Sequence, residues 1–388
     1  MIKSKKKIVF LTGTRADFGK LKSLISVIQS DIKFTVDIFV TGMHLQKKYG
    51  FTANEISDAG FKNIFKFKNF INDPSMEITL ANTITGFSKY IKENNPDLII
   101  IHGDRVEALA GAITGAINNI LVGHIEGGEV SGTIDESIRH AVSKFSHIHF
   151  TTDMPSKKRL IQLGEKSSNI FILGSPDFDL MKPSKMIPLD QAKEYYEIDF
   201  EEYGIVLFHP VTTELNQLRK DTKNLISSVK SSNKNFIVIY PNNDSGSQII
   251  IDEYLKNFKT DKFRLFPSLR FEYFLSLLKG ARLILGNSSC GLREAPFFGI
   301  PTINIGSRQN NRSSLKSIMH VPSDQKKISM LINNIFDSKI IPKNSLKNFK
   351  IDSDKKFLQI LSGTKIWRTS HQKNFHDISS IIYNKHFK

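Results

Sequence analysis

Short apolar runs alternate with helix-like patterns along almost the whole chain of 388 residues, and this alternation constrains the fold most. In the first half the strand-like runs are residues 8–11, 34–40, 97–101, 121–125, 148–151 and 170–173. The helical patterns between them cover about 18–29, 78–94, 106–118, a segment around Asp135, and 155–163. Strands that alternate with helices indicate a parallel sheet covered by helices on both faces.

The alternation restarts after a mixed, proline-containing segment at 180–201, which is typical of an interdomain connection. Strands are expected at 204–208, 236–240, 263–266, 282–285 and 302–305, with helices at about 213–230, 248–256, 271–278 and 289–298. Two domains are the default for this length. We therefore predict an α/β fold of two Rossmann-like domains that face each other across a cleft, residues 1–182 and 183–369. Residues 370–388 are expected to form a terminal helix that returns to the first domain.

Composition narrows the function classes. The formal net charge of +16 favours anionic ligands by general attraction, but no nucleic-acid-binding module accompanies it. A single cysteine excludes an intrachain disulfide and suits a reducing compartment. No apolar run is long enough for a membrane span, and residues 8–11 are too short for the core of a signal peptide. A cytoplasmic protein with no nucleic-acid or membrane partner is expected.

Three carboxylates fall at one edge of the first predicted sheet. Asp104 follows the strand at 97–101, Glu126 follows the strand at 121–125, and Asp135 lies in the first turn of the next helix, where Thr133 is the expected N-cap of a capping box with Glu136. Open α/β sheets bind ligands at the carboxyl ends of their strands. Three acids at that edge can serve as a base, an acid and an orienting group.

Two alternatives remain for these acids. In the first, they are ordinary loop and helix-start residues without a catalytic role. In the second, they bind a hard cation, which requires several carboxylates around one ion. Three histidines, His44, His102 and His124, follow or end strands and are interpreted as structural rather than metal-ligating.

Basic and hydroxyl side chains follow other strands and suit a phosphorylated ligand. Arg15 and Lys20 lie where the first helix opens, in a segment that matches neither a GxGxxG fingerprint nor a Walker loop. In the second half His209 and Arg308 each follow a strand and can donate to phosphate. His209 can alternatively lend a proton to a leaving group.

The segment 286–296, GNSSCGLREAP, combines a strand end with hydroxyl residues and the start of a helix. Ser288 and Ser289 are candidates to bind a diphosphate there, and Glu294 to accept from a ribose diol. We interpret Cys290 as a packing residue, because no activating partner is evident for a nucleophilic thiol.

Taken together, these segments resemble the sialic-acid-type UDP-N-acetylglucosamine 2-epimerases, specifically the hydrolysing bacterial branch. The resemblance rests on GTRADFGKLKSL, TGMH, HGDR, HIEGGEVSGTIDESIRH, GSPD, HPVTTE, YPNND, GNSSCGLREAP and GSRQNNR, which run in family order from residue 12 to 312. It implies a GT-B-like fold and the conversion of UDP-GlcNAc and water to ManNAc and UDP. The route implied is an anti elimination of UDP to 2-acetamidoglucal, followed by addition of water.

The resemblance also implies roles for single residues. Asp104, Glu126 and Asp135 match the catalytic acids and His209 the histidine on the phosphate side, while the UDP-binding positions are Arg15, Lys20, Ser288, Ser289, Glu294 and Arg308, with Arg105 also lining the cleft. No metal or nicotinamide cofactor is expected, and the family suggests a homo-oligomer, a dimer.

Three other functions are compatible with the sequence. A hydrolysing epimerase that acts on UDP-2,4-diacetamido-2,4,6-trideoxyglucose, for legionaminic acid, shares the same motifs. The second is a non-hydrolysing epimerase that returns UDP-ManNAc. The segment HIEGGEVSGTID speaks against it, because that branch of the family has a different sequence there. A glycosyltransferase of the same fold needs an acceptor site and no proton abstraction at C2.

Overall fold

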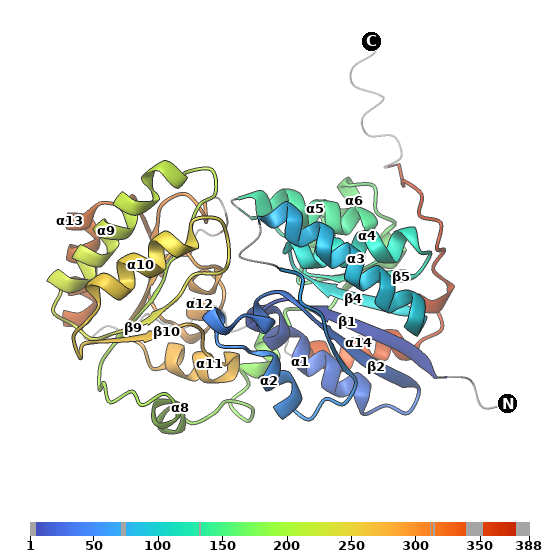
Figure 1. Cartoon of the computed structure of the whole chain (residues 1–388), viewed down its shortest axis with the longest axis horizontal. Coiled ribbons are helices and arrows are strands. Elements are labelled where there is room, and N and C mark those ends of the chain that lie inside the picture. Colours follow the sequence, from blue (N-terminus) through green and yellow to red (C-terminus); the bar gives the residue numbers. More distant parts are fainter. Residues whose placement is uncertain are drawn as a thin grey trace, which may run out of the picture.

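The computed structural model describes residues 5–70, 75–131, 133–310, 312, 315–338 and 352–377. Within them the chain forms two α/β halves, each built on one parallel sheet (Figure 1). The two-domain α/β architecture predicted from the alternation of strands and helices is therefore confirmed. Among the described residues no helix is both long and apolar enough to cross a membrane.

The first sheet has seven strands in the order β3-β2-β1-β4-β5-β6-β7. Its strands are β1 (Lys6–Thr12), β2 (Phe34–Val40), β3 (Ile64–Lys66), β4 (Leu98–His102), β5 (Leu121–Ile125), β6 (Ile148–Thr151) and β7 (Ile170–Ile172). The associated helices are α1 (Arg15–Gln29), α2 (Ala53–Asp58), α3 (Met76–Asn94), α4 (Val106–Ile117), α5 (Ile134–Phe145) and α6 (Met154–Gln162). The strands β4 and β5 are buried throughout, as expected for the centre of a parallel sheet.

The second sheet has six parallel strands in the order β10-β9-β8-β11-β12-β13. They are β8 (Gly204–Leu207), β9 (Phe236–Ile239), β10 (Phe263–Phe266), β11 (Leu283–Gly286), β12 (Thr302–Ile305) and β13 (Ile318–Val321). The helices of this half are α7 (Asp177–Leu180), α8 (Leu189–Tyr195), α9 (Leu215–Ser231), α10 (Ser247–Asn257), α11 (Phe271–Lys279), α12 (Glu294–Phe298) and α13 (Gln325–Asp337). The sequence patterns missed the strands β3 and β13 and the helices α2, α7, α8 and α13.

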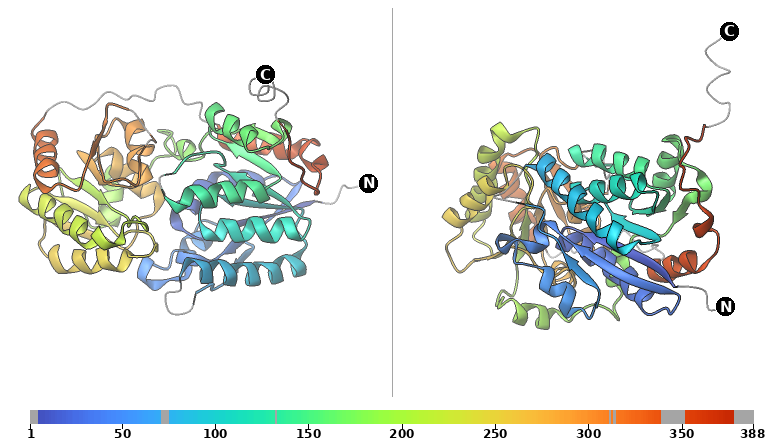
Figure 2. Two further views of the ribbon diagram at one scale, coloured as in Figure 1. Left: turned by 90° about the horizontal axis from the view of Figure 1, so that it is seen from above. Right: turned by 45° about the vertical axis from the view of Figure 1, so that its right-hand side comes forward.

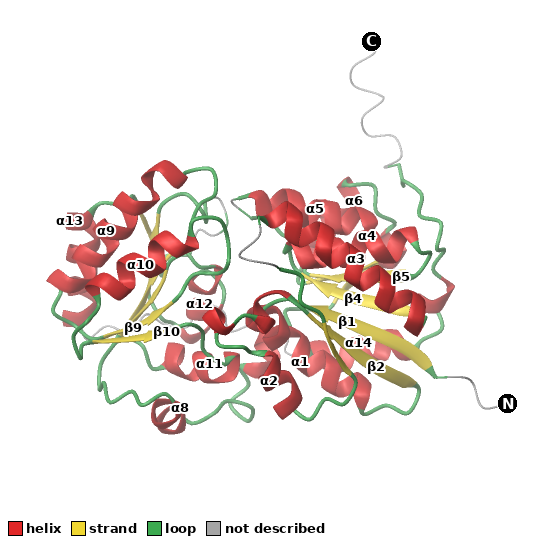
Figure 3. Ribbon diagram, viewed as in Figure 1, coloured by secondary structure: helices red, strands yellow, loops and turns green. Residues whose placement is uncertain are grey.

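Helices cover both faces of each sheet (Figures 1, 2 and 3). In the first half α3, α4 and α5 supply one apolar cluster, and α1 supplies the other. In the second half α9, α10 and α13 pack on one face, while α8, α11 and α12 pack on the other. The carboxyl ends of strands from both sheets lead to the same region between the halves, which is where ligands bind in open α/β sheets.

The domain limits differ from the predicted ones in two places. Residues 353–369 were assigned to the second half, but α14 (Ser353–Ser362) packs against α1 on the first sheet. Phe357 and Leu361 are buried in the core of that sheet, and Phe357 lies against Phe10 and Phe150. Conversely, Phe178 and Met181 belong to the core of the second half. Burial of these apolar side chains decides the assignment, since each half needs its own closed core.

The tail also differs from the expectation. Residues 370–377 return to the first half but are not helical, and residues 378–388 lie outside the described part of the chain. Lys373 Nζ donates to the carbonyls of Ser143, Lys144 and Ser146 at the end of α5 (2.6–2.9 Å). The tail thus supplies donors for helix-end carbonyls, and these contacts replace internal helical bonds.

Candidate functional site

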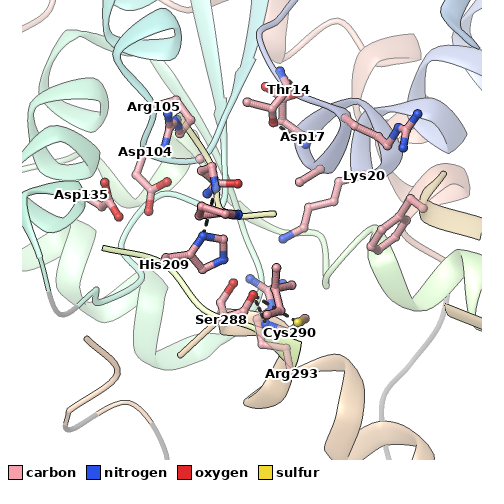
Figure 4. A pocket seen from close by; sticks show the side chains of 18 of the residues that line it. Thr14, Asp17, Lys20, Asp104, Arg105, Asp135, His209, Ser288, Cys290 and Arg293 are labelled. Carbon is pink, nitrogen blue, oxygen red and sulfur yellow. Dashed lines mark hydrogen bonds between the residues drawn. The ribbon is translucent and has the colours of Figure 1, made fainter. Parts of the chain in front are cut away.

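A cavity of about 260 Å³ lies between the two halves, at the carboxyl ends of strands from both sheets. Figure 4 shows Asp104 and Asp135 on one side of it and Ser288 and Arg293 on another. The eleven residues proposed above as catalytic or UDP-binding all line this cavity: Arg15, Lys20, Asp104, Arg105, Glu126, Asp135, His209, Ser288, Ser289, Glu294 and Arg308. Sequence positions up to 293 residues apart therefore meet in one place.

Glu126 is the most constrained of the acids. It directly follows β5, is 2% exposed, and has φ +65°, in the left-handed region that a residue with a Cβ rarely adopts. Such backbone strain costs about 1–2 kcal/mol and persists where the surroundings enforce it, often at functional sites. The turn therefore presents this carboxylate to the cavity at some cost in stability.

Three positively charged or polar partners hold the Glu126 carboxylate. Lys20 Nζ lies 3.2 Å from Oε1, Arg293 Nη2 lies 2.7 Å from the same oxygen, and His102 Nε2 lies 3.2 Å from Oε2. Burial would raise the pKa of Glu126, but the charges of Arg293 and Lys20 outweigh it and hold the pKa well below its usual value. Glu126 is therefore a carboxylate throughout the neutral range.

Arg293 was not among the predicted site residues. It comes from the second half, between a 3-10 turn and α12. It also donates to Glu129 (3.1 Å) and Ser175 of the facing loops and to Asp177 at the start of α7 (3.2 Å). The signal was present in the sequence, because Arg293 immediately precedes Glu294 in GLREAP. It joins the two halves directly at the acid that follows β5.

Asp104 is held by a different arginine, Arg139 of α5. Nη2 of Arg139 donates to Oδ2 of Asp104, and the Ser131 hydroxyl donates to the same oxygen (3.2 Å). Burial would raise the pKa of Asp104, but Arg139, Arg312 and Arg105 together lower it below the usual value. Asp104 is therefore ionised, and it still lines the cavity.

Asp135 has the opposite electrostatics. Thr133 is the N-cap of α5, as predicted, and its hydroxyl donates to Asp135 Oδ2 (2.9 Å) and accepts from the Asp135 N–H. The predicted capping box is not formed, because the Glu136 carboxylate accepts from the Ser131 N–H instead. Burial and the charge of Asp104 raise the pKa of Asp135, although Arg308 Nη2 lies 3.3 Å away. The two aspartates thus differ in proton affinity.

Arg105 and Arg308 both cross between the halves. Arg105 donates to Asp244 Oδ1 (2.6 Å) and to the Asn243 side chain, both in the loop after β9. Arg308, in the loop after β12, donates to Asn287 O (3.4 Å) and pairs with Asp135. Both guanidinium groups line the cavity and are available to an anion there.

His209 is a neutral donor. Its Nδ1 accepts from the Asn242 backbone N–H (3.1 Å), so the ring proton of the neutral form is on Nε2. Asn287 fixes the backbone by accepting from His209 N (2.7 Å) and donating to His209 O (2.9 Å). Burial, with Arg308 and Arg105 nearby, lowers the pKa of His209 to about 3. It can donate a hydrogen bond but carries no charge at neutral pH.

The helix expected at 289–298 is interrupted, and this is a correction. Residues Ser289–Gly291 form a 3-10 turn capped by Ser288, and α12 begins only at Glu294. The reason is Pro296, which lacks an N–H and would clash with the carbonyl of residue 292 in a continuous helix, but fits the first turn of α12. Ser288 and Ser289 therefore lie on the cavity wall at a 3-10 turn and not at the N-terminus of a long helix.

The other residues of this segment are buried against the cavity. Burial and the nearby Asp177 raise the pKa of Glu294 to about 7, and its Oε2 is without a protein partner. Burial and the charge of Glu294 raise the pKa of the Cys290 thiol to about 12, which suits a packing role and not a nucleophile.

Arg15 follows Thr14, which caps α1 in a reciprocal capping box with Asp17. Its guanidinium pairs with Glu55, while Nε and Nη1 are buried without protein partners. Burial, partly offset by Tyr196, lowers its pKa to about 10, so the group remains charged. An anionic ligand in the cavity would satisfy the remaining donors.

The histidines interpreted as structural divide into two groups. His44 lies between the hydroxyls of Thr12 and Thr52, and His124 between Ser143 and Gly103 O, as a structural role requires. His102 instead lines the cavity, where its Nε2 lies 3.2 Å from Glu126 Oε2, so it also belongs to the site. Among the residues that the structure describes, no group of three or more His, Cys, Asp or Glu side chains is placed to hold a metal ion.

Comparison with known proteins agrees with this geometry. Residues 26–368 match the family model described as UDP-N-acetylglucosamine 2-epimerase. The chain is 45% identical to the UDP-N-acetylglucosamine 2-epimerase of Neisseria meningitidis serogroup B, over 96% of this chain and all of the relative. It is 34% identical to the hydrolyzing UDP-N,N'-diacetylbacillosamine 2-epimerase of Legionella pneumophila (81% and 85% covered). It is 32% identical to the polysialic acid biosynthesis protein P7 of Escherichia coli (96% and 98% covered).

The fold has solved counterparts. The structure of MnaA from S. aureus with UDP superimposes with a TM-score of 0.75 at 16% identity, over 96% of this chain and all of that one. At this identity the likeness concerns the arrangement of the two α/β domains.

Proposed function

Because the chain belongs to the UDP-N-acetylglucosamine 2-epimerase family, we propose that it is the hydrolysing form of the enzyme, which converts UDP-GlcNAc and water to ManNAc and UDP. The observation that carries the epimerisation at C2 is the pair of neighbouring aspartates in the cavity, one with a lowered and one with a raised pKa. The hydrolysing form is supported by the 34% identity to a hydrolyzing 2-epimerase. Two titratable groups whose environments separate their pKa values are suited to act as base and acid.

The pair fits the two proton transfers of the reaction. In the first step the ionised Asp104 removes the C2 proton while UDP leaves C1 on the opposite face, which gives 2-acetamidoglucal. In the second step Asp135, whose pKa is raised by burial and by the charge of Asp104, delivers a proton to C2 from the other face. Water adds at C1 and gives up one proton, which restores the proton on Asp135, and C2 is inverted. Two different carboxyl groups are needed because the two protons are exchanged on opposite faces of the ring.

Departure of UDP from C1 is supported from the second half. Ser288, Ser289, Arg308 and the Nε2–H of His209 line the cavity from the second half. These donors would bind the diphosphate and stabilise the negative charge that develops on it. His209 fits this role as a neutral donor, since a group with a pKa of about 3 is not a general acid at neutral pH.

Apolar side chains in the lining of the cavity suit a nucleobase. Ile239, Pro267, Leu269, Phe271 and Phe274 line it. The polar side chain of Asn242 and the hydroxyl of Ser268 stand among them. Glu294, beside the serines, would accept from the ribose hydroxyls. Glu126 remains ionised between Lys20 and Arg293. It would orient the sugar and take no part in the transfer of the C2 proton.

A second substrate is supported by one finding. The similarity to the hydrolyzing UDP-N,N'-diacetylbacillosamine 2-epimerase, at 34% identity, supports a UDP-diacetamido-trideoxy sugar as the alternative. The 45% identity to the Neisseria UDP-N-acetylglucosamine 2-epimerase favours UDP-GlcNAc. Similarity to the polysialic acid protein supports sialic acid synthesis as the use of the ManNAc formed.

The test runs both nucleotide sugars side by side and identifies the products by NMR. The proposal expects free ManNAc and UDP from UDP-GlcNAc, at a higher kcat/KM than for the diacetamido sugar. Recovery of UDP-ManNAc would show the non-hydrolysing reaction. A preference for the diacetamido sugar would establish the second candidate.

A further inference from the structure

One buried arginine contacts two of the three acids, and the reaction proposed above assigns it no part. Arg139 of α5 is 4% exposed and lines the cavity. Its Nη2 donates to Asp104 Oδ2 and to the Ser131 hydroxyl (3.3 Å), while its Nη1 donates to the backbone carbonyl of Glu126 (2.8 Å). A planar guanidinium is the side chain that can serve two acceptors in fixed directions.

We propose that Arg139 is a positioning residue that sets both acids at once: one arm of its guanidinium orients the Asp104 carboxylate, and the other holds the strained backbone turn that presents Glu126. The inference rests on the proposed elimination, because it concerns the carboxylate that takes the C2 proton. It assigns to α5 a second task besides carrying Asp135 at its first turn.

The bond from Arg139 to the Glu126 carbonyl supports a strained backbone turn. The residue at φ +65° is Glu126, and its N–H is already bonded to Phe150 O (2.9 Å). The Arg139 bond to its carbonyl secures the other side of the same peptide turn. Without that donor a buried carbonyl would lose its partner at the very residue that carries the strain.

The carboxylate contact sets the charge of the base. The charged groups near Asp104 are Arg139 from α5, Arg312 from the loop after β12, Arg105 and His102 from its own loop and strand, and Asp135 at the start of α5. Of these, Arg139 lowers the pKa of Asp104 most, against the effect of burial. Loss of its charge must therefore raise the pKa of Asp104, whatever the contribution of the others.

The experiment compares the pH profiles of kcat/KM for wild type, Arg139→Met and Arg139→Lys with UDP-GlcNAc. A base with a low pKa gives a rate that falls only at low pH. Arg139→Met should move this acidic limb up by about one pH unit or more, so that kcat/KM one unit below the new limb is reduced about tenfold relative to its plateau. Arg139→Lys should leave the limb in place and lower kcat, because one ammonium cannot serve both acceptors.

Arg159→Met is the matched control. Arg159 of α6 donates to Gly128 O (3.0 Å), in the same loop as Glu126, and makes no contact with Asp104. Its acidic limb should coincide with that of wild type. An unmoved limb in Arg139→Met, or an equal shift in Arg159→Met, would overturn the proposal. If Arg139→Met does not fold, Arg139→Lys decides, since a wild-type kcat or a shifted limb in that variant contradicts it.

The product of the wild-type enzyme keeps this test separate from the proposed function. Free ManNAc from wild type supports the hydrolysing reaction whatever the variants do. If wild type instead returns UDP-ManNAc, the proposed function fails, yet the limb shift can still be measured, because both epimerase reactions remove the C2 proton.

Discussion

Replacement of Arg293 by methionine should destabilise the protein by about 3 kcal/mol at pH 7. Arg293 is the cation closest to Glu126 and also contacts Asp177 and Glu129. Removal of one partner from a buried ion pair costs about 3–5 kcal/mol, because the remaining charge is left uncompensated. We take the lower end of that range, since Lys20 and His102 remain beside Glu126.

The pH dependence of this loss follows from Glu126. Its pKa is lowered in the folded protein, so it adds stability that is fully present above the pKa of an unfolded glutamate and is lost as the pH falls through the folded value. Removal of Arg293 raises the folded value and shrinks that contribution. The difference in stability between wild type and Arg293→Met should therefore be largest at neutral pH and should decrease below about pH 4.5.

Urea unfolding followed by tryptophan fluorescence measures this difference. The single tryptophan, Trp367, packs against Phe34 in the core of the half that carries Glu126. Arg159→Met serves as the control and should cost about 1 kcal/mol, the value of one hydrogen bond. A loss below about 1 kcal/mol in Arg293→Met at pH 7, or a loss that grows as the pH falls, would refute the reasoning.

Three further predictions concern activity. Glu126→Gln should lose most turnover while it still binds UDP in calorimetry, and a rate near wild type would remove Glu126 from the mechanism. His209→Asn should lower kcat by about 10²-fold, because a hydrogen-bond donor to the developing charge is lost. The pH profile of kcat between pH 5 and 8 should stay the same, because His209 is neutral there. A change of the profile in that range would show that His209 titrates. Cys290→Ala should retain activity, and the wild-type thiol should resist iodoacetamide at pH 8 because its pKa is raised to about 12; rapid alkylation would contradict this.

Much of the fold and site could be predicted because parallel α/β sheets impose simple rules. Apolar runs gave the central strands, and the residues that follow each strand gave Asp104, Glu126, His209 and Arg308, since strand ends of one sheet share an edge. The facing of the two halves brought both sets together in one cavity.

Most of the missed features depend on tertiary packing, for which the local sequence gives at best a weak signal. Arg293 and Arg139 read as ordinary helix-start and helix-surface arginines, and only the tertiary fold brings their guanidinium groups to the acids. The helix α14 looks like part of the second half by position, but the burial of Phe357 on the first sheet decides otherwise. The break before Glu294 was readable from Pro296, and the periodicity of the apolar residues hid it.

The central claim is that one carboxylate in this cavity removes the C2 proton of a nucleotide sugar and another delivers a different proton to C2. The diphosphate is held from the other half. The direct measurement is the reaction of wild type with UDP-GlcNAc in deuterated water, with the product analysed by NMR and mass spectrometry. The account predicts free ManNAc that carries one deuterium at C2 in every molecule. ManNAc with protium at C2 would contradict it, because the proton would then never have left the sugar.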